Sequence, residues 1–439
     1  MRECGMLLPI ASLPSKYGIG CFSKEAYEFV DQLKEGGQSF WQILPLGPTG
    51  FGDSPYQAFS AFAGNPYFID LEQLVGEGLL TEDECEEADF GDDDRYIAYD
   101  KIYKARFKVL KKAYERWKKD HHQFLKSKLD PETIEYCFYM AVKDHFKSAS
   151  WNKWDKDIRL RKPAAVEKYK KMLADEIGFY EFQQIEFNEQ WSRLKAYANE
   201  NGIRIIGDIP IYVAFDGADS WAHPELFQFD EECLPKAVAG CPPDAFSATG
   251  QLWGNPLYDW GYHKKDHYSW WIKRMEYSLK LYDVVRVDHF RGFEAYYSIP
   301  YGDPTAEFGH WEKGPGLDLF ARLKKSLKKE ELPIIAEDLG FLTPEVHEML
   351  KESGFPGMKV LEFAFDDSEN SDYLPHKYQE NCIVYTGTHD NETLVGWYEN
   401  MNRRNKSFAR EYMAAAIHQR RRCTGSSSAW LWQVRRSWQ

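Results

Sequence analysis

Several features that direct a chain to a membrane, to nucleic acid or to an oxidising compartment are missing from this sequence. No apolar run approaches the roughly 18 residues that a membrane helix needs, and the start MRECGMLLPIASLPS lacks the long apolar region of a signal peptide. The formal net charge of −14 disfavours nucleic acid and anionic membranes, because both attract basic surfaces. The eight cysteines are scattered without a CxxC pair or zinc spacing, which indicates reduced thiols. We therefore expect a cytoplasmic protein that binds neither nucleic acid nor membrane, and no feature favours a particular oligomeric state.

The common signatures of nucleotide, serine-hydrolase and metal chemistry are also absent. The chain contains no GxGxxG, P-loop or GxSxG motif, and its 12 histidines form no HExxH or other clustered spacing. His263 and His267 in HKKDH lie at helical spacing without a third ligand nearby, so a packing or solvated role is favoured over a metal site. We expect neither a metal nor a cofactor.

Aromatic residues, in contrast, are abundant. They make up 16% of the chain and include 15 tryptophans and 27 tyrosines. Most of them are expected to pack in the core, which the 43% of hydrophobic residues can make large. The surplus also suits sugar binding, because flat rings stack on apolar sugar faces while polar tips hydrogen-bond hydroxyls.

Seven short apolar runs alternate with amphipathic, charged stretches, as buried parallel strands alternate with helices. These runs cover Gly5–Ile10, Trp41–Leu46, Ile203–Val213, Tyr282–Phe290, Leu332–Gly340, Gly357–Phe365 and Cys382–Asn391. One intervening stretch has helix signals, with Thr343 as a cap, Pro344 in the first turn and Gly354 at the end. An eighth run, Asn65–Leu71, has no helical stretch before it, so we expect a loop excursion there.

This alternation predicts a right-handed α/β fold of the (β/α)8 TIM-barrel type with an inserted helical subdomain. Residues 1–71 would supply the first two strands, and residues 194–422 strands three to seven. Residues 72–193 are charged and helical and would form the insertion. The basic run Lys111–His122 within it is expected to be a solvated helix face rather than a partner site.

Acidic residues stand at the ends of four of these runs. Asp208 ends RIIGD, Asp288 ends VVRVD, Glu337 and Asp338 end IIAED, and Asp390 ends VYTGTHD. A single acidic residue there is usually a helix cap or an ion-pair partner. The carboxyl ends of barrel strands form the active-site face, however, so four such ends would converge on one cleft. Two carboxylates flanking one bond are what glycoside cleavage needs.

Basic residues flank these carboxylates. His289 follows Asp288, His389 precedes Asp390, and Arg286 lies two residues before Asp288. On a strand, Arg286 and Asp288 share a face. The guanidinium would help keep the Asp288 carboxylate ionised, as a nucleophile requires.

At these residues the chain resembles glycoside hydrolase family 77, the amylomaltases or 4-α-glucanotransferases, from LLPIASLPS to HQRRR. The resemblance rests on SPYQAFSAFAGNPYFIDL, IIGDIPIYVAFDGADSW, GCPPDAFSATGQLWGNPLYDW, VRVDHFRGFEAYYSIP, AEDLG and YTGTHDNETLVGW. It implies transfer of an α-1,4-glucan segment to the 4-hydroxyl of glucose or another maltodextrin, through a covalent glucosyl-aspartate. The implied partners are maltodextrins, glucans derived from starch or glycogen, and glucose as acceptor.

The resemblance also implies roles for individual residues. Asp288 would be the nucleophile, Glu337 the general acid and base about 5 Å from it, and Asp390 the group that holds hydroxyls of the sugar and stabilises its transition state. Substrate contacts are implied for Ser54, Tyr56, Asp208, Asp244, Gln251, Trp253, Arg286 and His389. Three of these lie in a lid loop at about 240–256, and a lid that excludes water would favour transfer over hydrolysis.

Two other functions remain open. An α-amylase-like α-1,4-glucan hydrolase would share the barrel and the carboxylates and differ in its acceptor. An inactive glucan-binding remnant is disfavoured by the intact carboxylates but gains weight from the end of the chain.

Seven strand runs are one fewer than a barrel needs, and residues 423–439, CTGSSSAWLWQVRRSWQ, lose all periodicity. One choice of codons that the genetic code permits for Thr424 onward, when read in the frame that starts one base earlier, encodes Tyr-Trp-Glu-Leu-Ile-Arg-Leu-Ala-Leu-Ala. These residues are mostly good helix formers. We therefore expect an out-of-frame tail, a barrel truncated before its eighth strand, and weak activity.

Overall fold

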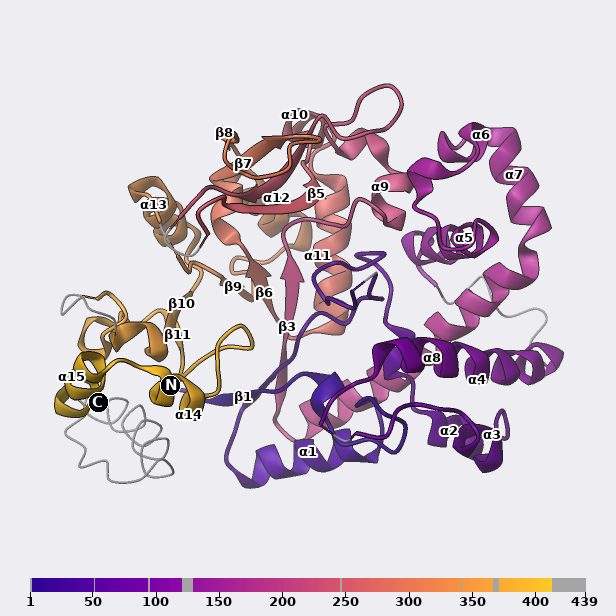
Figure 1. Ribbon diagram of the computed structural model, residues 1–439, viewed down its shortest axis with the longest axis horizontal. Helices are drawn as coiled ribbons and strands as arrows, with labels where there is room; N and C mark the ends of the chain where they lie inside the picture. Colours follow the sequence, from indigo (N-terminus) through magenta and orange to yellow (C-terminus); the bar gives the residue numbers. More distant parts are fainter. Residues whose placement is uncertain are drawn as a thin grey trace.

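Seven short strands of the described residues pair in parallel, in a five-stranded and a two-stranded sheet (Figure 1). The computed structural model describes residues 2–50, 52–93, 95–120, 129–244, 247–340, 342–365 and 371–412. Five strands form one sheet in the order β1 (Gly5–Leu7), β2 (Phe40–Gln42), β3 (Arg204–Pro210), β6 (Val284–Asp288) and β9 (Ile334–Ala336). The strands β10 (Gly357–Val360) and β11 (Cys382–Tyr385) pair in parallel, and the Ala336 N–H donates to Pro356 O over 3.0 Å, which connects β9 to the start of β10.

All seven predicted strands are therefore present, each shorter than its apolar run. Asn65–Leu71 contains the 3-10 helix η2 (Pro66–Phe68) and no strand, which confirms that it is not one of them. Strands β3, β6, β9 and β10 are largely buried, whereas β1 is mostly exposed and β11 is partly buried. Ile206, Ile335 and Met358 form one inner cluster of side chains, whereas Val285 and Val287 belong to the main core. Burial on both faces of β3, β6 and β9 explains why their runs are continuously apolar rather than alternating.

Helices that connect the strands pack against them with one apolar face. They include α1 (Lys24–Glu35), α11 (Ser269–Leu281), α12 (Leu317–Leu327) and α13 (Pro344–Ser353). In α12 the buried side chains are Leu319, Phe320 and Leu323, at helical spacing. The predicted start and end of α13 are confirmed, with Thr343 as its N-cap and Gly354 in the left-handed conformation at its end. Smaller helices are α9 (Ala218–Ala222), α10 (Trp260–Lys265), α14 (Leu394–Asn400) and α15 (Arg403–Tyr412).

The described residues between β2 and β3 contain helices and no strand (Figure 1). These helices are α2 (Leu71–Gly76), α3 (Glu82–Glu86), α4 (Tyr99–Asp120), α5 (Pro131–His145), α6 (Lys156–Arg159), α7 (Pro163–Met172) and α8 (Ala174–Glu200). The predicted boundary at residue 193 falls inside α8. That helix contacts α4 and α5 and also α1 and β3, so one continuous helix belongs to both regions. The division into domains stays a prediction.

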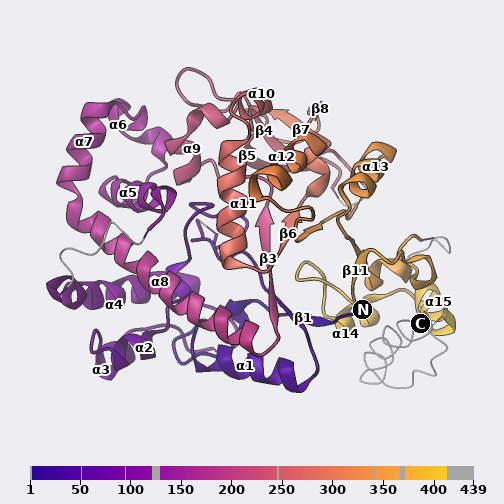
Figure 2. The same ribbon diagram turned by 180° about the vertical axis from the view of Figure 1, so that it is seen from behind.

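A second sheet, which the sequence did not predict, lies beside the ends of the parallel strands (Figure 2). It is antiparallel, in the order β5 (Gln251–Pro256), β4 (Ala237–Cys241), β7 (Ala295–Pro300) and β8 (His310–Lys313). The predicted lid loop at 240–256 thus contains the end of β4 and the whole of β5, which pair as a β-hairpin, with residues 242–250 between them. Glycines and prolines hide the alternation of β4 and β5, whose strand conformation depends on pairing with each other and with β7.

The strands β1 and β11, at the two ends of the parallel array, line a common cavity. This cavity of about 1370 Å³ is also lined by residues of β2, β6 and β9. Among the described strands, β1 pairs only with β2, and β11 only with β10.

The predicted out-of-frame tail, residues 423–439, lies outside the described residues. Within the described part of the chain, no helix combines the length and the apolar character needed to cross a bilayer.

Candidate active site

The parallel strands bring the predicted carboxylates to one end of the sheet. Asp288 is the last residue of β6, and Asp208 on β3 is paired in register with Arg286. Glu337 directly follows β9, and its N–H donates to Val287 O over 3.0 Å. The strand-end rule therefore places three acidic side chains together although they are far apart along the chain.

Arg286 joins two of these carboxylates. Its Nη1 lies 2.6 Å from Asp208 Oδ2, and its Nη2 lies 2.8 Å from Asp288 Oδ1. The Asp208 side chain is 0% exposed and that of Arg286 3%, whereas 32% of Asp288 is open to solvent. Burial raises the pKa of Asp288 to about 7, with Arg286 acting in the opposite direction. Burial also acts to lower the pKa of Arg286, but the two carboxylates outweigh it and leave that pKa above its ordinary value.

Glu337 is held by backbone donors on both oxygens. Its Oε2 accepts the His289 N–H over 2.8 Å, and its Oε1 accepts the Leu339 N–H over 2.7 Å. Burial raises the pKa of Glu337 above its ordinary value, although Arg286 and these two N–H groups act against the rise. A carboxyl fixed in position and with a raised pKa has the properties of a general acid.

Tyr56 links Asp208 to the loop after β11. Its hydroxyl donates to Asp208 Oδ2 over 2.9 Å and lies 2.6 Å from His389 Nε2. The two rings stack with centroids 5.7 Å apart. His389 Nε2 is in turn 3.3 Å from Asp390 Oδ2, and the Asp390 side chain is 70% exposed. A continuous polar chain thus runs from the buried Asp208 to the open Asp390.

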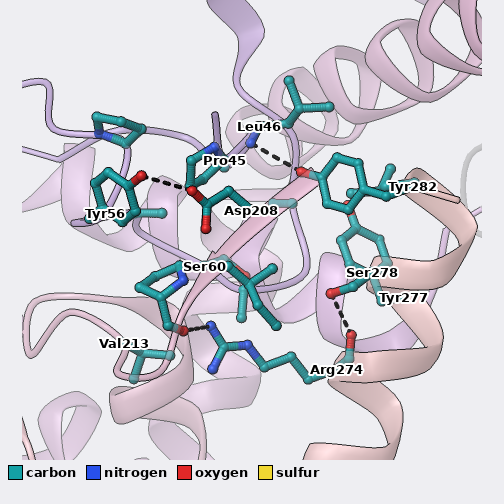
Figure 3. Close-up of a pocket in the computed structure, with 18 of the residues that line it drawn as sticks. Pro45, Leu46, Tyr56, Ser60, Asp208, Val213, Arg274, Tyr277, Ser278 and Tyr282 are labelled. Carbon is teal, nitrogen blue, oxygen red and sulfur yellow. Dashed lines mark hydrogen bonds between the residues drawn. The ribbon is translucent and has the colours of Figure 1, made fainter. Parts of the chain in front are cut away.

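A small cavity backs Asp208 and Tyr56 (Figure 3). Its volume of about 50 Å³ holds water rather than a sugar. Figure 3 shows Tyr56 pointing toward Asp208 and the Tyr282 hydroxyl meeting the Leu46 N–H, a contact of 3.3 Å. This packing fixes Asp208, whose Oδ2 accepts both the Tyr56 hydroxyl and Arg286 Nη1.

The remaining predicted residues lie at the edge of the site. Ser54 Oγ accepts the Tyr56 N–H over 3.3 Å and so shapes the turn that carries Tyr56. On β5, the Trp253 indole N–H donates to Gln251 Oε1 over 3.1 Å, and the Trp253 ring meets His289 edge to face at 4.8 Å. Asp244 lies in the hairpin connection, where its Oδ1 accepts the Ser247 N–H.

Several contributors were not predicted. Gln57 Nε2 donates to Asn255 Oδ1 over 3.1 Å, which ties the DSPYQ loop to β5. Gln42 Oε1 accepts the Tyr385 hydroxyl over 2.7 Å, across the inside of the strand array. A polar residue inside the apolar run FWQIL was the available signal for Gln42. His263, by contrast, is buried beside the rings of Tyr258 and Trp260, which confirms the packing role proposed for it.

Known proteins match this chain over most of its length. The profile of glycoside hydrolase family 77, described as 4-alpha-glucanotransferase, matches residues 8–436. A 4-alpha-glucanotransferase of Clostridium butyricum is 54% identical over 394 residues, which are 89% of this chain and 80% of that protein. One of Streptococcus pneumoniae is 52% identical over 418 residues, 94% of this chain and 82% of that protein. The solved amylomaltase of Streptococcus agalactiae in complex with acarbose superposes with a TM-score of 0.92 at 44% identity, covering 95% of this chain and 86% of that one.

Proposed function

We infer that this chain, which belongs to glycoside hydrolase family 77 and is a 4-α-glucanotransferase, performs its transfer through Asp288, Glu337 and Asp390. The observation that carries the assignment is the pairing of two differently held carboxyls. Asp288 is bound to a guanidinium, which opposes the rise that burial causes in its pKa, whereas Glu337 is held by two backbone N–H groups and has a raised pKa. A carboxylate paired with a cation beside a carboxyl that can hold a proton is what a retaining double displacement needs.

In the first step Asp288 attacks the anomeric carbon of the donor glucan. Arg286 occupies Oδ1 of Asp288, which leaves Oδ2 for the attack. As the new C1–O bond forms, the bond from C1 to the leaving 4-oxygen breaks, and Glu337 gives its proton to that oxygen. The reducing-side glucan departs, and the donor segment remains as an ester on Asp288.

In the second step an acceptor replaces the departed glucan. Its 4-hydroxyl attacks C1 of the ester while Glu337 takes the hydroxyl proton, and Asp288 leaves as a carboxylate. Two inversions at C1 retain the α configuration. One α-1,4 bond is broken and one is formed, so maltodextrins and glucans derived from starch or glycogen serve as donors, and glucose or another maltodextrin as acceptor.

The polar chain beside Asp208 would bind the sugar on the donor side. Asp390 is exposed and next to His389, so we assign it the hydroxyls of the sugar at the cleaved bond. Tyr56 and Asp208 fix the positions of His389 and Arg286. Ser54 would act through the turn that carries Tyr56.

The β4–β5 hairpin would cover the bound glucan. Trp253 offers an aromatic ring beside His289, and aromatic rings stack on sugar faces. Gln251 and Asp244 place polar groups on the same hairpin, where they would meet glucan hydroxyls. Exclusion of water by this hairpin would favour the sugar acceptor.

We also propose that the seven parallel strands are seven of the eight of a (β/α)8 barrel. The cavity of about 1370 Å³ lined by β1 and β11 supports this, because the inside of such a barrel is normally packed. The bond from Tyr385 on β11 to Gln42 on β2 supports a curved array. A cytoplasmic location is supported by the seven cysteines of the described residues, all of them free thiols.

Incubation with maltotriose as the sole substrate tests the function. A transferase gives glucose together with maltodextrins longer than maltotriose. A hydrolase gives only glucose and maltose, and that product pattern would assign the alternative function. Asp288→Asn and Glu337→Gln are matched controls, since each removes one catalytic carboxylate with little change of shape, and both should abolish the longer products.

A further inference from the structure

His289 occupies the turn between the two reacting carboxyls. It directly follows Asp288, and its N–H donates to Glu337 Oε2 over 2.8 Å. Its φ is +56°, in the left-handed region that residues with a Cβ seldom adopt. The Gly292 N–H donates to His289 O over 2.9 Å, and the Phe290 N–H to Glu337 O over 3.1 Å, so the turn is held on both sides. The strained conformation is what aims the N–H of residue 289 at Glu337.

The ring of His289 faces a different element. It meets the Trp253 ring on β5 edge to face, with centroids 4.8 Å apart and an interplanar angle of 88°. His289 Nε2 is buried and has no hydrogen-bond partner among the described residues. Burial lowers the pKa of His289 to about 3, and Arg291 acts in the same direction. The imidazole is therefore neutral throughout the working range of pH and contributes packing rather than charge.

A neutral residue is required at this position. Glu337 must hold a proton in the first step, and a cation directly beside it would stabilise its carboxylate and lower its pKa. Burial is the largest cause of the raised pKa of Glu337, so whatever keeps water from this carboxyl maintains its function as an acid. The indole of Trp253 packs against the imidazole of His289, the residue whose N–H holds this carboxyl.

We propose that His289 is a positioning residue that couples Trp253 of the β4–β5 hairpin to Glu337. The Trp253 ring supports the imidazole, the imidazole excludes water from Glu337, and the N–H of the same residue fixes the Glu337 oxygen. The position of the β4–β5 hairpin thereby sets the proton affinity of Glu337, the general acid. This inference rests on the proposed role of Glu337.

Other charged and titratable groups around Glu337 stay in place when the two rings are changed. Among the described residues they include Arg286 and Asp288 on β6, the adjacent Asp338, Cys241 at the end of β4, and Tyr373. A shift in the titration of Glu337 after a change at Trp253 or His289 therefore results from the loss of the aromatic ring.

The test uses Trp253→Ala, His289→Asn, the double variant and Trp253→Phe. Asparagine accepts the left-handed conformation, so His289→Asn removes the ring and keeps the backbone donor. In the profile of kcat against pH, activity falls at high pH as the acid loses its proton. Trp253→Ala and His289→Asn should each move this basic limb to lower pH by at least half a unit. On the limb itself, that shift lowers kcat about threefold. The double variant should move it no further than the larger single shift, and Trp253→Phe should restore it.

Additive shifts in the double variant, or a changed KM with an unmoved basic limb, would overturn the coupling. A merely structural role would lower the melting temperature without moving the limb, so thermal unfolding is measured on each variant. Wild-type disproportionation of maltotriose is followed in the same series. Failure of the wild type would overturn the proposed function itself, whereas an active wild type with an unmoved limb in the variants overturns only the role of His289.

Discussion

Replacement of Arg286 by glutamine removes the cation between two carboxylates. The guanidinium, 3% exposed, is bonded at 2.6 Å to Asp208, which is itself fully buried. Loss of one partner of a buried ion pair costs about 3–5 kcal/mol, because the remaining charge has neither water nor a counter-ion. We expect Arg286→Gln to lower the free energy of unfolding by about 3 kcal/mol, measured by urea denaturation at pH 8.

The same change should displace the pH profile of catalysis. Arg286 opposes the rise in the pKa of Asp288 to about 7, so its removal moves that pKa higher. The attack proposed for Asp288 requires its carboxylate form, which exists above its pKa, so the acidic limb of kcat/KM should move to higher pH. A shift of one unit lowers kcat/KM about tenfold well below the pKa. Glucose release from maltotriose between pH 5 and 9 measures the limb.

Two further variants separate the stability effect from the catalytic one. The double variant Asp208→Asn with Arg286→Gln has no lone buried charge, so it should recover most of the stability but not the wild-type acidic limb. Arg286→Lys should fall between wild type and Arg286→Gln, because a single ammonium group cannot bridge both carboxylates as the guanidinium fork does. An Arg286→Gln protein with wild-type stability and an unmoved acidic limb would refute this account of the ion pairs.

Two predictions concern neighbouring groups. Glu362 is 6% exposed, and burial, with the charge of Glu392 adding to it, raises its pKa from 4.5 to about 7. Because only the folded state keeps this proton between those values, stability is lost as the pH rises through them. Glu362→Gln should thus stabilise the protein by about 2 kcal/mol at pH 8 and hardly at pH 4 in urea titrations, and a gain independent of pH would contradict the argument. Tyr56→Phe removes the hydroxyl shared by Asp208 and His389, and should lower kcat for maltotriose about tenfold and stability by about 1–2 kcal/mol. Ser54→Ala should do the same more weakly, and an effect larger than that of Tyr56→Phe would assign Ser54 a role of its own.

The central parallel strands β3, β6 and β9 could be predicted because their burial on both faces makes them continuous apolar runs. The antiparallel sheet could not, because Gly254 and Pro256 interrupt Gln251–Pro256, Gly240 interrupts its partner Ala237–Cys241, and cross-strand pairing supplies their order. The continuity of α8 across the predicted domain boundary at residue 193 could not be read from the sequence either, because it depends on the packing of that helix beside both α5 and β3.

The contacts of the site can likewise be divided into those that the sequence predicts and those that it does not. Residues fixed by strand geometry, such as Arg286 and Asp288 on one face of β6, could be expected to meet, and they lie 2.8 Å apart. The link between Tyr56 and His389 joins positions 333 residues apart through two loops, which no spacing rule relates. The backbone donor of His289 depends on a left-handed φ that its residue type permits but does not require.

The covalent intermediate on Asp288 is the central claim, and trapping it is the most direct test. Glu337→Gln is incubated with α-maltosyl fluoride, whose fluoride leaves without an acid, so the first step proceeds while the second lacks its base. Mass spectrometry should show one maltosyl group added to the protein, on the peptide that contains Asp288, and no addition when Asp288→Asn is combined with it. An adduct on another residue, or fluoride release with an inverted product and no adduct, would contradict the account.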